Sequence, residues 1–191
     1  MLETGRLLLR RWTPADLAPF AELNADPGVM EHFPALLTRE QSDALAERCV
    51  AGLERYGFGL WAVEVKASGE FIGFTGLAVP NFEAHFTPAV EVGWRLRRLA
   101  WGHGYATEAA TASLDHAFGP AGLGEVVSLT ATTNLRSAAV MRRLGMTRDP
   151  ADDFDHPVLP EGSPLRRHVL YRLDAATWRA RRHTAIADRP Q

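Results

Sequence analysis

The feature that most constrains the fold is a change of hydrophobic period within residues 89–133. Residues 89–98, AVEVGWRLRR, alternate in the manner of a strand, whereas residues 105–118, YATEAATASLDHAF, have the composition and spacing of a helix. β-branched residues then dominate 125–133, EVVSLTATT. A strand, a helix and a second strand in this order predict a parallel pair of strands joined by a right-handed crossover.

The N-terminal part of the chain adds a strand and two helices. Residues 6–12 are typical of a first strand, and Thr13 followed by proline is typical of a helix start. A second helix is expected to begin at Thr38, where Gln41 completes a capping box, and to end at Gly57.

The remaining segments complete one domain. Residues 60–79 alternate like a hairpin whose turn is KASGE. Residues 134–146 predict a short helix, 149–164 a polar loop broken by prolines, and 166–174 a last strand before a terminal helix. The expected order is β-α-α-β-β-β-α-β-α-β and a terminal helix, in a single α/β domain with a mixed sheet.

Length, charge and cysteine content bound the class of protein. A chain of 191 residues is typical of a single domain. Its one cysteine, Cys49, excludes an internal disulfide and indicates a reducing, cytoplasmic location. The formal net charge of −2 provides no overall attraction for nucleic acid. The apolar run near the N-terminus is too short for a signal peptide or a membrane anchor. We therefore expect no nucleic-acid partner and no membrane partner.

Two glycines, Gly102 and Gly104, separate the strand from the helix of the crossover. Such a turn presents unpaired N–H groups at the positive end of the helix dipole, which favours an anion and phosphate above all. A P-loop would need Lys-Ser or Lys-Thr where Tyr105 and Ala106 stand, and a dinucleotide fingerprint would need a third glycine at Thr107. Neither pattern is met, so the turn predicts an anion site of another kind, with an empty tight turn as the alternative.

The turn and its surroundings resemble a known family. RRLAWGHGYATEA at 97–109 is similar to the acyl-CoA binding motif of the GCN5-related N-acetyltransferases, particularly of their ribosomal-protein and small-molecule branch. NLRSAAVMRRLGM at 134–146 resembles the second hallmark of that branch, and RLLLRRWTPAD and EVGWRL also match. The resemblance covers residues 3–178, which we interpret as the N-acetyltransferase domain, followed by a basic C-terminal tail at 179–191.

The resemblance implies both a fold and an activity. The fold would be a mixed, mostly antiparallel sheet with a parallel β-α-β core, a splayed strand pair and helices on both faces. The activity would be direct transfer of an acetyl group from acetyl-CoA, as co-substrate, to a primary amine of a protein N-terminus or a small molecule. A homodimer is plausible for the same reason. A non-catalytic acyl-CoA-binding or regulatory module is the alternative, and a nucleotide-binding domain unrelated to CoA is a third interpretation.

The same resemblance suggests the residues that bind acetyl-CoA. The backbone N–H of Val92 or Gly93 is expected to polarise the thioester carbonyl. Leu99 stands where the family usually carries Gln or Arg, so Arg97 or Arg98 is expected to neutralise the phosphates instead. Arg142 and Arg143 are the alternatives. The expected cofactor-binding residues are Val92, Gly93, Arg97, Arg98, Trp101, Gly102, His103, Gly104, Tyr105, Ala106, Asn134 and Ser137.

Two residues are expected to be catalytic. Ser137 would lie near the leaving thiolate and donate a hydrogen bond or a proton, and Glu91 would be the general base. Tyr105 and Tyr171 are alternative donors. The alternative bases are His85, His168 and Glu108.

The run DDFDH at 152–156 contains residue types that bind metals. It is flanked by prolines in a polar loop, and no second cluster accompanies it, so we expect no metal site. We interpret the run as a loop over the substrate mouth, where negative charge would favour a cationic amine.

Overall fold

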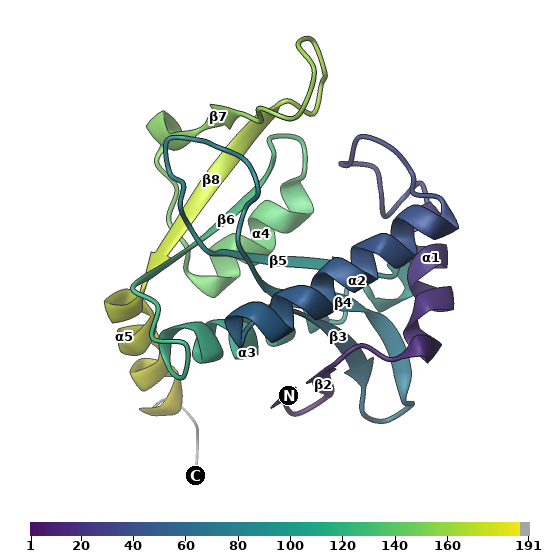
Figure 1. The fold of residues 1–191 in the computed structure, drawn as a ribbon. Helices are drawn as coiled ribbons and strands as arrows, with labels where there is room; N and C mark the ends of the chain where they lie inside the picture. The colour runs from purple at the N-terminus through teal and green to yellow at the C-terminus, as the bar shows by residue number, and fades with distance from the viewer. Residues whose placement is uncertain (188–191) are drawn as a thin grey trace.

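An eight-stranded mixed sheet forms the centre of the molecule (Figure 1). The computed structural model describes residues 1–187, with side chains through Thr184. The strand order is β1-β2-β3-β4-β5-β6-β8-β7, and every neighbouring pair is antiparallel except β5 with β6. The strands are β1 (Leu2–Glu3), β2 (Leu7–Arg10), β3 (Leu60–Val65), β4 (Glu70–Ala78), β5 (Glu91–Leu96), β6 (Glu125–Ala131), β7 (Phe154–Asp155) and β8 (Arg167–Asp174).

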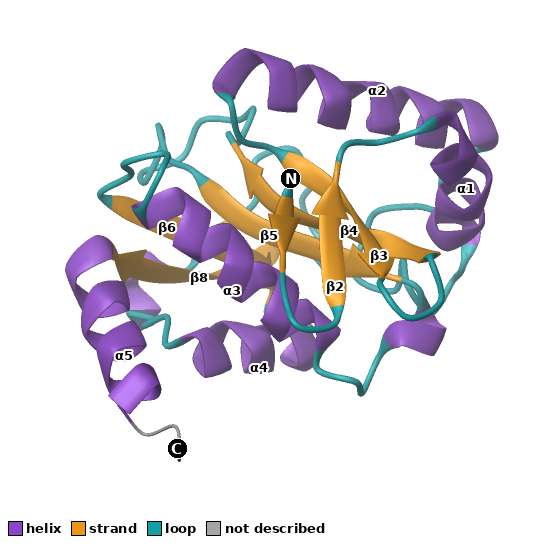
Figure 2. Cartoon of the chain, turned by 90° about the horizontal axis from the view of Figure 1, so that it is seen from below, coloured by secondary structure: helices purple, strands orange, loops and turns teal. Residues whose placement is uncertain are grey.

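Helices cover both faces of this sheet. In Figure 2, α2 lies on one side of the strands, and α3 and α4 lie on the other. Helix α1 packs on the same face as α2, and α5 follows β8 directly. The helices are α1 (Leu17–Ala25), α2 (Arg39–Tyr56), α3 (Tyr105–Phe118), α4 (Leu135–Leu144) and α5 (Ala175–Ala187), with short 3₁₀ turns at Pro14–Asp16, Arg98–Ala100 and Pro150–Asp152.

The helix ends follow the capping chemistry of the sequence. Thr38 Oγ1 accepts a hydrogen bond from the Gln41 amide, and the Gln41 side chain accepts one from the Thr38 amide, so the predicted capping box of α2 is confirmed. Gly57 ends the helix with φ of 72°, in the left-handed region that glycine adopts without strain. Thr13 stands at the N-cap of the 3₁₀ turn that leads into α1, as expected.

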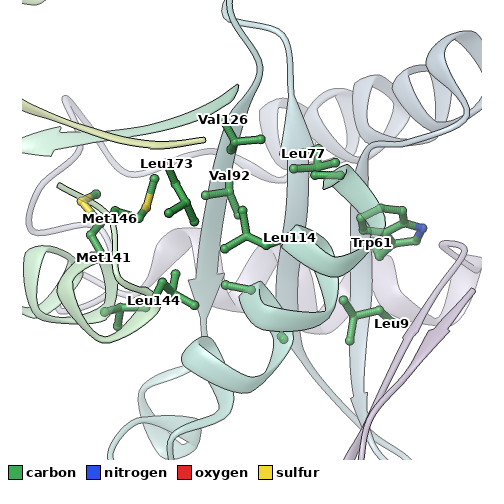
Figure 3. Packing of buried hydrophobic residues seen from close by; sticks show 14 of the residues in the cluster. Leu9, Trp61, Leu77, Val92, Leu114, Val126, Met141, Leu144, Met146 and Leu173 are labelled. Atoms are coloured by element: carbon green, nitrogen blue, oxygen red, sulfur yellow. The ribbon is translucent and has the colours of Figure 1, made fainter. Parts of the chain in front are cut away.

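The main hydrophobic core lies between the sheet and α3. Val92 of β5, Leu114 of α3 and Val126 of β6 are completely buried there, and α4 adds Met141 and Leu144 (Figure 3). A second cluster around Phe20 and Phe74 fills the space between the sheet and α1. The first cluster packs α3 against β5 and β6, whereas the second packs α1 against β3 and β4.

The expected order of elements and the parallel β5–β6 pair are confirmed. Two short edge strands, β1 and β7, were not expected. The boundary expected at residue 178 falls inside α5, where Arg182 pairs with Asp115 of α3 (Nη2–Oδ2 2.9 Å). Residues 188–191 of the expected tail lie outside the described residues. Within the described part, no helix is both long and apolar enough to cross a membrane.

The core predicts the effect of truncating one leucine. Leu114→Ala removes a completely buried side chain of α3, and we expect the free energy of unfolding to fall by about 2–5 kcal/mol. Leu99→Ala, at a leucine that is 82% exposed, is the matched control and should change stability by less than about 0.5 kcal/mol. Urea unfolding of both variants measures the difference; equal stabilities would contradict this description of the core.

Candidate functional site

The two parallel strands separate almost as soon as they pair (Figure 1). Glu91 opposite Val127 is the one register pair between β5 and β6, whereas β4 and β5 pair from Gly73–Leu96 to Ala78–Glu91. Beyond this pair the β5–β6 ladder stops, and a splayed strand pair results, as expected from the resemblance.

The backbone groups at this opening differ from those expected. Val127 N donates to Val90 O (2.9 Å), and a residue in a parallel ladder bonds to both neighbours of its partner, so the Val92 N–H is also engaged. Gly93 lies in the ladder with β4, opposite Gly76. Neither of the two amides expected to meet the thioester is therefore free. The next amide of β5 on the open edge belongs to Trp94, which the sequence analysis did not single out.

The glycine turn leads into α3 with its N–H groups unpaired. Gly102 and Gly104 both have φ of 79°, a conformation that strains any other L residue. The first intrahelical bond of α3 runs from the Glu108 amide to Gly104 O (3.0 Å), so the amides of residues 105–107 have no partner in the helix. The His103 ring is exposed and stacks on the Tyr105 ring.

The N-terminus of α4 is built by Asn134. Its Oδ1 accepts from the Ser137 amide (3.1 Å) and its Nδ2 donates to Thr130 Oγ1 (3.0 Å), so this side chain is a helix cap fixed to β6. Both functional groups of the Asn134 amide therefore already have partners. The Ser137 hydroxyl has no hydrogen-bond partner within the described chain.

These elements surround a cavity of about 680 Å³. It is bounded by the end of β5, the starts of α3 and α4, and the loop between α1 and α2. Its lining residues are Gly28, Val29, Glu31, His32, Phe33, Trp94, Arg95, Leu96, Ala100, Trp101, Gly102, Gly104, Tyr105, Ala106, Thr107, Asn134, Leu135, Arg136, Ser137, Ala139, Val140 and Arg143.

Most of the expected cofactor residues meet at this cavity, and several do not. Trp101, Gly102, Gly104, Tyr105, Ala106, Asn134 and Ser137 line it. Val92, Gly93, Arg97, Arg98 and His103 are not among the lining residues. The amides of Val92 and Gly93 pair within the sheet. The side chains of Arg97, Arg98 and His103 are directed elsewhere.

The arginines at the cavity are not the ones expected first. Arg97 pairs with Glu22 (Nη2–Oε2 3.2 Å) and Glu70 (Nη1–Oε1 3.3 Å) away from the lining. The side chain of Arg98 lies over Gly28, in the loop between α1 and α2. The arginines that line the cavity near α4 are Arg136 and Arg143, and the Arg136 guanidinium lies 4.9 Å from the centre of the Trp101 ring. Of the two rivals for the phosphates, Arg143 lines the cavity and Arg142 does not.

Glu91 lies at the vertex of the opening, outside the cavity lining. It is on the face of β5 opposite Val92, with Oε1 3.7 Å from the position that a Cβ on Gly93 would occupy. No hydrogen bond or ion pair holds its carboxylate within the described residues. Burial raises the pKa of Glu91 to about 7. This carboxyl group therefore changes its charge near neutral pH.

The alternative bases are engaged elsewhere. Glu108 accepts hydrogen bonds from Thr4 Oγ1 (2.6 Å) and from Arg6 Nε (2.7 Å), and despite its partial burial these bonds hold its pKa below the usual value. His85 contacts Asp152 (Nε2–Oδ1 3.2 Å), and the buried His168 contacts the Arg166 carbonyl. None of the three lines the cavity.

The other reactive groups also have structural surroundings. Tyr171 is buried and receives a hydrogen bond from Arg142 (3.4 Å). Burial raises the pKa of the Cys49 thiol to about 12, and Cys49 does not line the cavity. Asp152 and Asp153 are neutralised by Arg172 and Arg148. The negative charge expected at a substrate mouth is thus largely paired, and no cluster of three potential metal ligands occurs among the described residues.

One wall of the cavity, the loop between α1 and α2, was not predicted from the sequence. His32 Nδ1 lies 3.3 Å from Thr133 Oγ1, directly before α4, so this loop closes the open side of the strand pair. Arg95 was missed too. Its position on a strand of alternating residues gave no indication of function, because its environment comes from a loop 62 residues earlier, at Phe33.

Comparisons with known proteins agree with this architecture. A model of the acetyltransferase (GNAT) domain matches residues 6–147. Protein YkkB of Bacillus subtilis is 34% identical over 146 residues, which cover 76% of this chain and 84% of that protein. The FsC-acetyl coenzyme A-N(2)-transacetylase of Aspergillus fumigatus is 42% identical over 95 residues, which cover 48% of this chain and 40% of that longer protein.

Solved structures share the fold over almost the whole chain. An acetyltransferase from Agrobacterium tumefaciens is 30% identical with a TM-score of 0.72, covering 90% of this chain and 92% of that one. YncA of Salmonella typhimurium, solved with its cofactor acetyl-CoA, is 17% identical with a TM-score of 0.66, covering 88% of this chain and 94% of that one. The splayed strands, the glycine turn and the matched domain together lead to one conclusion: the chain belongs to the GNAT acetyltransferase family.

Proposed function

We propose that this protein is an acetyl-CoA-dependent N-acetyltransferase that transfers the acetyl group directly to a primary amine. The observation that carries the proposal is the cavity at the splayed strands, where the N-termini of α3 and α4 meet. An acyltransferase activity belongs to the family. The amine as acceptor is the step beyond it, supported by the N(2)-transacetylase name of the Aspergillus relative.

The residues present fit the phosphates of CoA. Unpaired amides of residues 105–107 point from the start of α3, and the positive end of the helix dipole favours an anion there. Arg136 and Arg143 bring positive charge to the same cavity, and the carboxylate of Glu108, in the first turn of α3, is occupied by Arg6 and Thr4. Acetyl-CoA bound there would supply an activated acetyl group as a thioester.

The chain's own groups can then support direct transfer. Glu91 accepts a proton from the amine nitrogen, which forms a C–N bond to the acetyl carbon as the C–S bond breaks. The Trp94 amide is the open N–H of β5 that can stabilise the developing oxyanion. Ser137 donates a hydrogen bond to the leaving sulfur. The thiol Cys49 is buried away from the cavity, which supports transfer without an acyl-enzyme on that residue.

A change at the glycine turn tests CoA binding. Gly104→Val introduces a branched side chain at φ of 79° and displaces the amides that bind phosphate, so we expect the Kd for CoA to rise at least about tenfold. Gly122→Val is the matched control, since Gly122 also has a positive φ (65°) but lies outside the cavity lining. Calorimetric titration with CoA compares the two, and equal Kd values would argue against the phosphate role of the turn.

The pKa of Glu91 predicts the pH dependence of turnover. The rate constant kcat/KM for an amine should rise with pH through a midpoint near 7 as Glu91 loses its proton and becomes a base. Glu91→Gln should lower kcat by roughly a hundredfold and remove this limb of the profile. Release of free CoA thiol with a panel of amines and peptides provides the rate. A variant that keeps the wild-type profile would exclude Glu91 as the base.

An independent measurement checks the same titration without catalysis. The folded pKa of Glu91 is above the unfolded value, so the unfolded chain loses this proton first and the wild-type protein loses stability between about pH 4.5 and 7. The loss amounts to at most about 3 kcal/mol. Glu91→Gln should lack this part of the pH dependence in urea unfolding, whereas Glu161→Gln, at an exposed glutamate, should retain it.

Ser137→Ala tests the group assigned to the leaving thiolate. We expect kcat to fall by about ten- to a hundredfold with little change in the Kd for CoA, because one hydrogen bond that strengthens in the transition state is lost. Ser68→Ala, in the exposed β3–β4 turn, is the control. Unchanged kcat for Ser137→Ala would remove this residue from the mechanism. CoA binding without thiol release across the amine panel would favour the non-catalytic module.

A further inference from the structure

Arg95 is a charged residue of the cavity that the proposed mechanism does not use. It lies on β5 and lines the cavity beside the loop between α1 and α2. Its side chain is on the same face of β5 as Glu91, because residues four apart on a strand point the same way. Val92 and Leu96 pack into the opposite core. Arg95 therefore faces the side of the strand pair away from α3, where α1 and its loop cover the sheet.

The surroundings of Arg95 hold the guanidinium but do not neutralise it. Nη1 donates to Asn24 Oδ1 (2.6 Å), and the Phe33 ring lies 3.9 Å below the guanidinium carbon. Asn24 is itself completely buried and donates to Ser42 of α2 (2.9 Å), so its orientation is fixed. No carboxylate pairs with Arg95 among the described residues, in contrast to Arg97, which directly follows β5.

One atom of this side chain is conspicuously unsatisfied. Arg95 Nε is buried and has no hydrogen-bond partner, the single such side-chain atom found in the described part of the chain. An unsatisfied buried donor is destabilising, and an unpaired buried charge is more so. Nη2 also has no partner there, yet it is not among the fully buried atoms. A partly open, unpaired guanidinium edge at a cavity is suited to an incoming anion.

The other charged groups near Arg95 do not replace that anion. Glu31 and His32 line the same cavity, but neither forms an ion pair with Arg95, and Glu31 Oε2 lies 3.8 Å from His32 Nε2 instead. Cys49 of α2 is close enough to influence the charge of Arg95, but burial keeps its thiol protonated. Burial also lowers the pKa of Arg95 to about 10, so the guanidinium remains charged at neutral pH.

We propose that Arg95 binds a carboxylate of the acceptor, so that the acceptor is an amino acid or another small amine that carries a carboxylate. This inference rests on the proposed function, and it selects the small-molecule acceptor over the N-terminus of a protein. The planar guanidinium suits a carboxylate, and a charge-assisted hydrogen bond in a largely dry site is stronger than a neutral one. Asn24 is a positioning residue, because it acts through Arg95.

The face of β5 leaves room for such an acceptor. Gly93 lies between Glu91 and Arg95 and has no side chain, so the surface between the base and the guanidinium is open at that position. The Cα atoms of Glu91 and Arg95 are separated by about 13 Å along an extended strand, and Glu91 Oε1 lies over Gly93, between the two residues. An amine directed to Glu91 and a carboxylate directed to Arg95 therefore fit one molecule of modest length.

Matched pairs of acceptors test this assignment. The panel contains the common L-amino acids and straight-chain ω-amino acids, each beside its carboxamide, with acetyl-CoA as donor and thiol release as readout. For at least one pair, the wild-type protein should prefer the acid by about tenfold or more in kcat/KM. Arg95→Gln should remove this preference by raising KM for the acid, while the rate with the carboxamide and the Kd for CoA stay within about twofold.

A second variant and a control separate charge recognition from structural damage. Asn24→Asp retains an oxygen for Arg95 Nη1 and supplies an internal carboxylate, so it should weaken the acid preference in a folded protein that still contains Arg95. Arg39→Gln removes an exposed arginine that pairs with Asp43 and should keep the wild-type preference. Acids and carboxamides that react equally well with the wild-type protein would overturn the proposal and leave the proposed acetyl transfer intact.

Calorimetry tests the Arg95 assignment even if no amine of the panel is acetylated. The CoA-saturated protein is titrated with each acid and its carboxamide, and the same dependence on Arg95 is expected in the Kd values. Absence of thiol release with all amines would contradict the proposed function, while acid-selective binding that Arg95→Gln abolishes would still support the anion site. Absence of any acid preference in binding would overturn the Arg95 assignment.

Discussion

The site depends on one interruption of the sheet, the early end of the ladder between β5 and β6. A continued ladder would use the backbone groups of both strands and bring their side chains together, and it would leave no cavity. The interruption follows the single pair Glu91–Val127, and Ser128 Oγ donates to Val92 O (2.9 Å) just beyond it. A side chain thus satisfies a carbonyl that the ladder leaves free, which stabilises the separation without an unpaired buried group.

The opening divides the functional groups between its two sides. The starts of α3 and α4, with Arg136 and Arg143, provide positive potential on one side and suit the phosphates of CoA. Glu91 and Arg95 share the opposite face of β5, which suits the acceptor. A single strand can supply both sides because its side chains alternate. The splay between β5 and β6 lets the two sides meet where an acyl group would be transferred.

Much of this arrangement could be predicted from the sequence, and the reasons are local. Gly102 and Gly104 require no partner to permit a positive φ, and Thr38 and Asn134 cap helices through residues three positions away. Periodicity alone indicated the order of the strands and helices. The resemblance to GCN5-related N-acetyltransferases pointed to the splayed strands and to Ser137, which lines the cavity.

The predictions that the structure corrects concern residues whose role depends on partners far away in the sequence. Arg97 lies only two residues after Arg95. Glu22 and Glu70 neutralise Arg97, whereas no carboxylate pairs with Arg95 among the described residues. The amides of Val92 and Gly93 are used by neighbouring strands, which spacing along the chain does not reveal. The helix caps, the glycine turn and the alternation of β5 follow from the amino-acid sequence alone, because these rest on contacts within a few residues. The folded arrangement was needed to show which amide of β5 is open, which arginines face the cavity and how strongly Glu91 holds its proton, because burial and charge pairing come from distant segments.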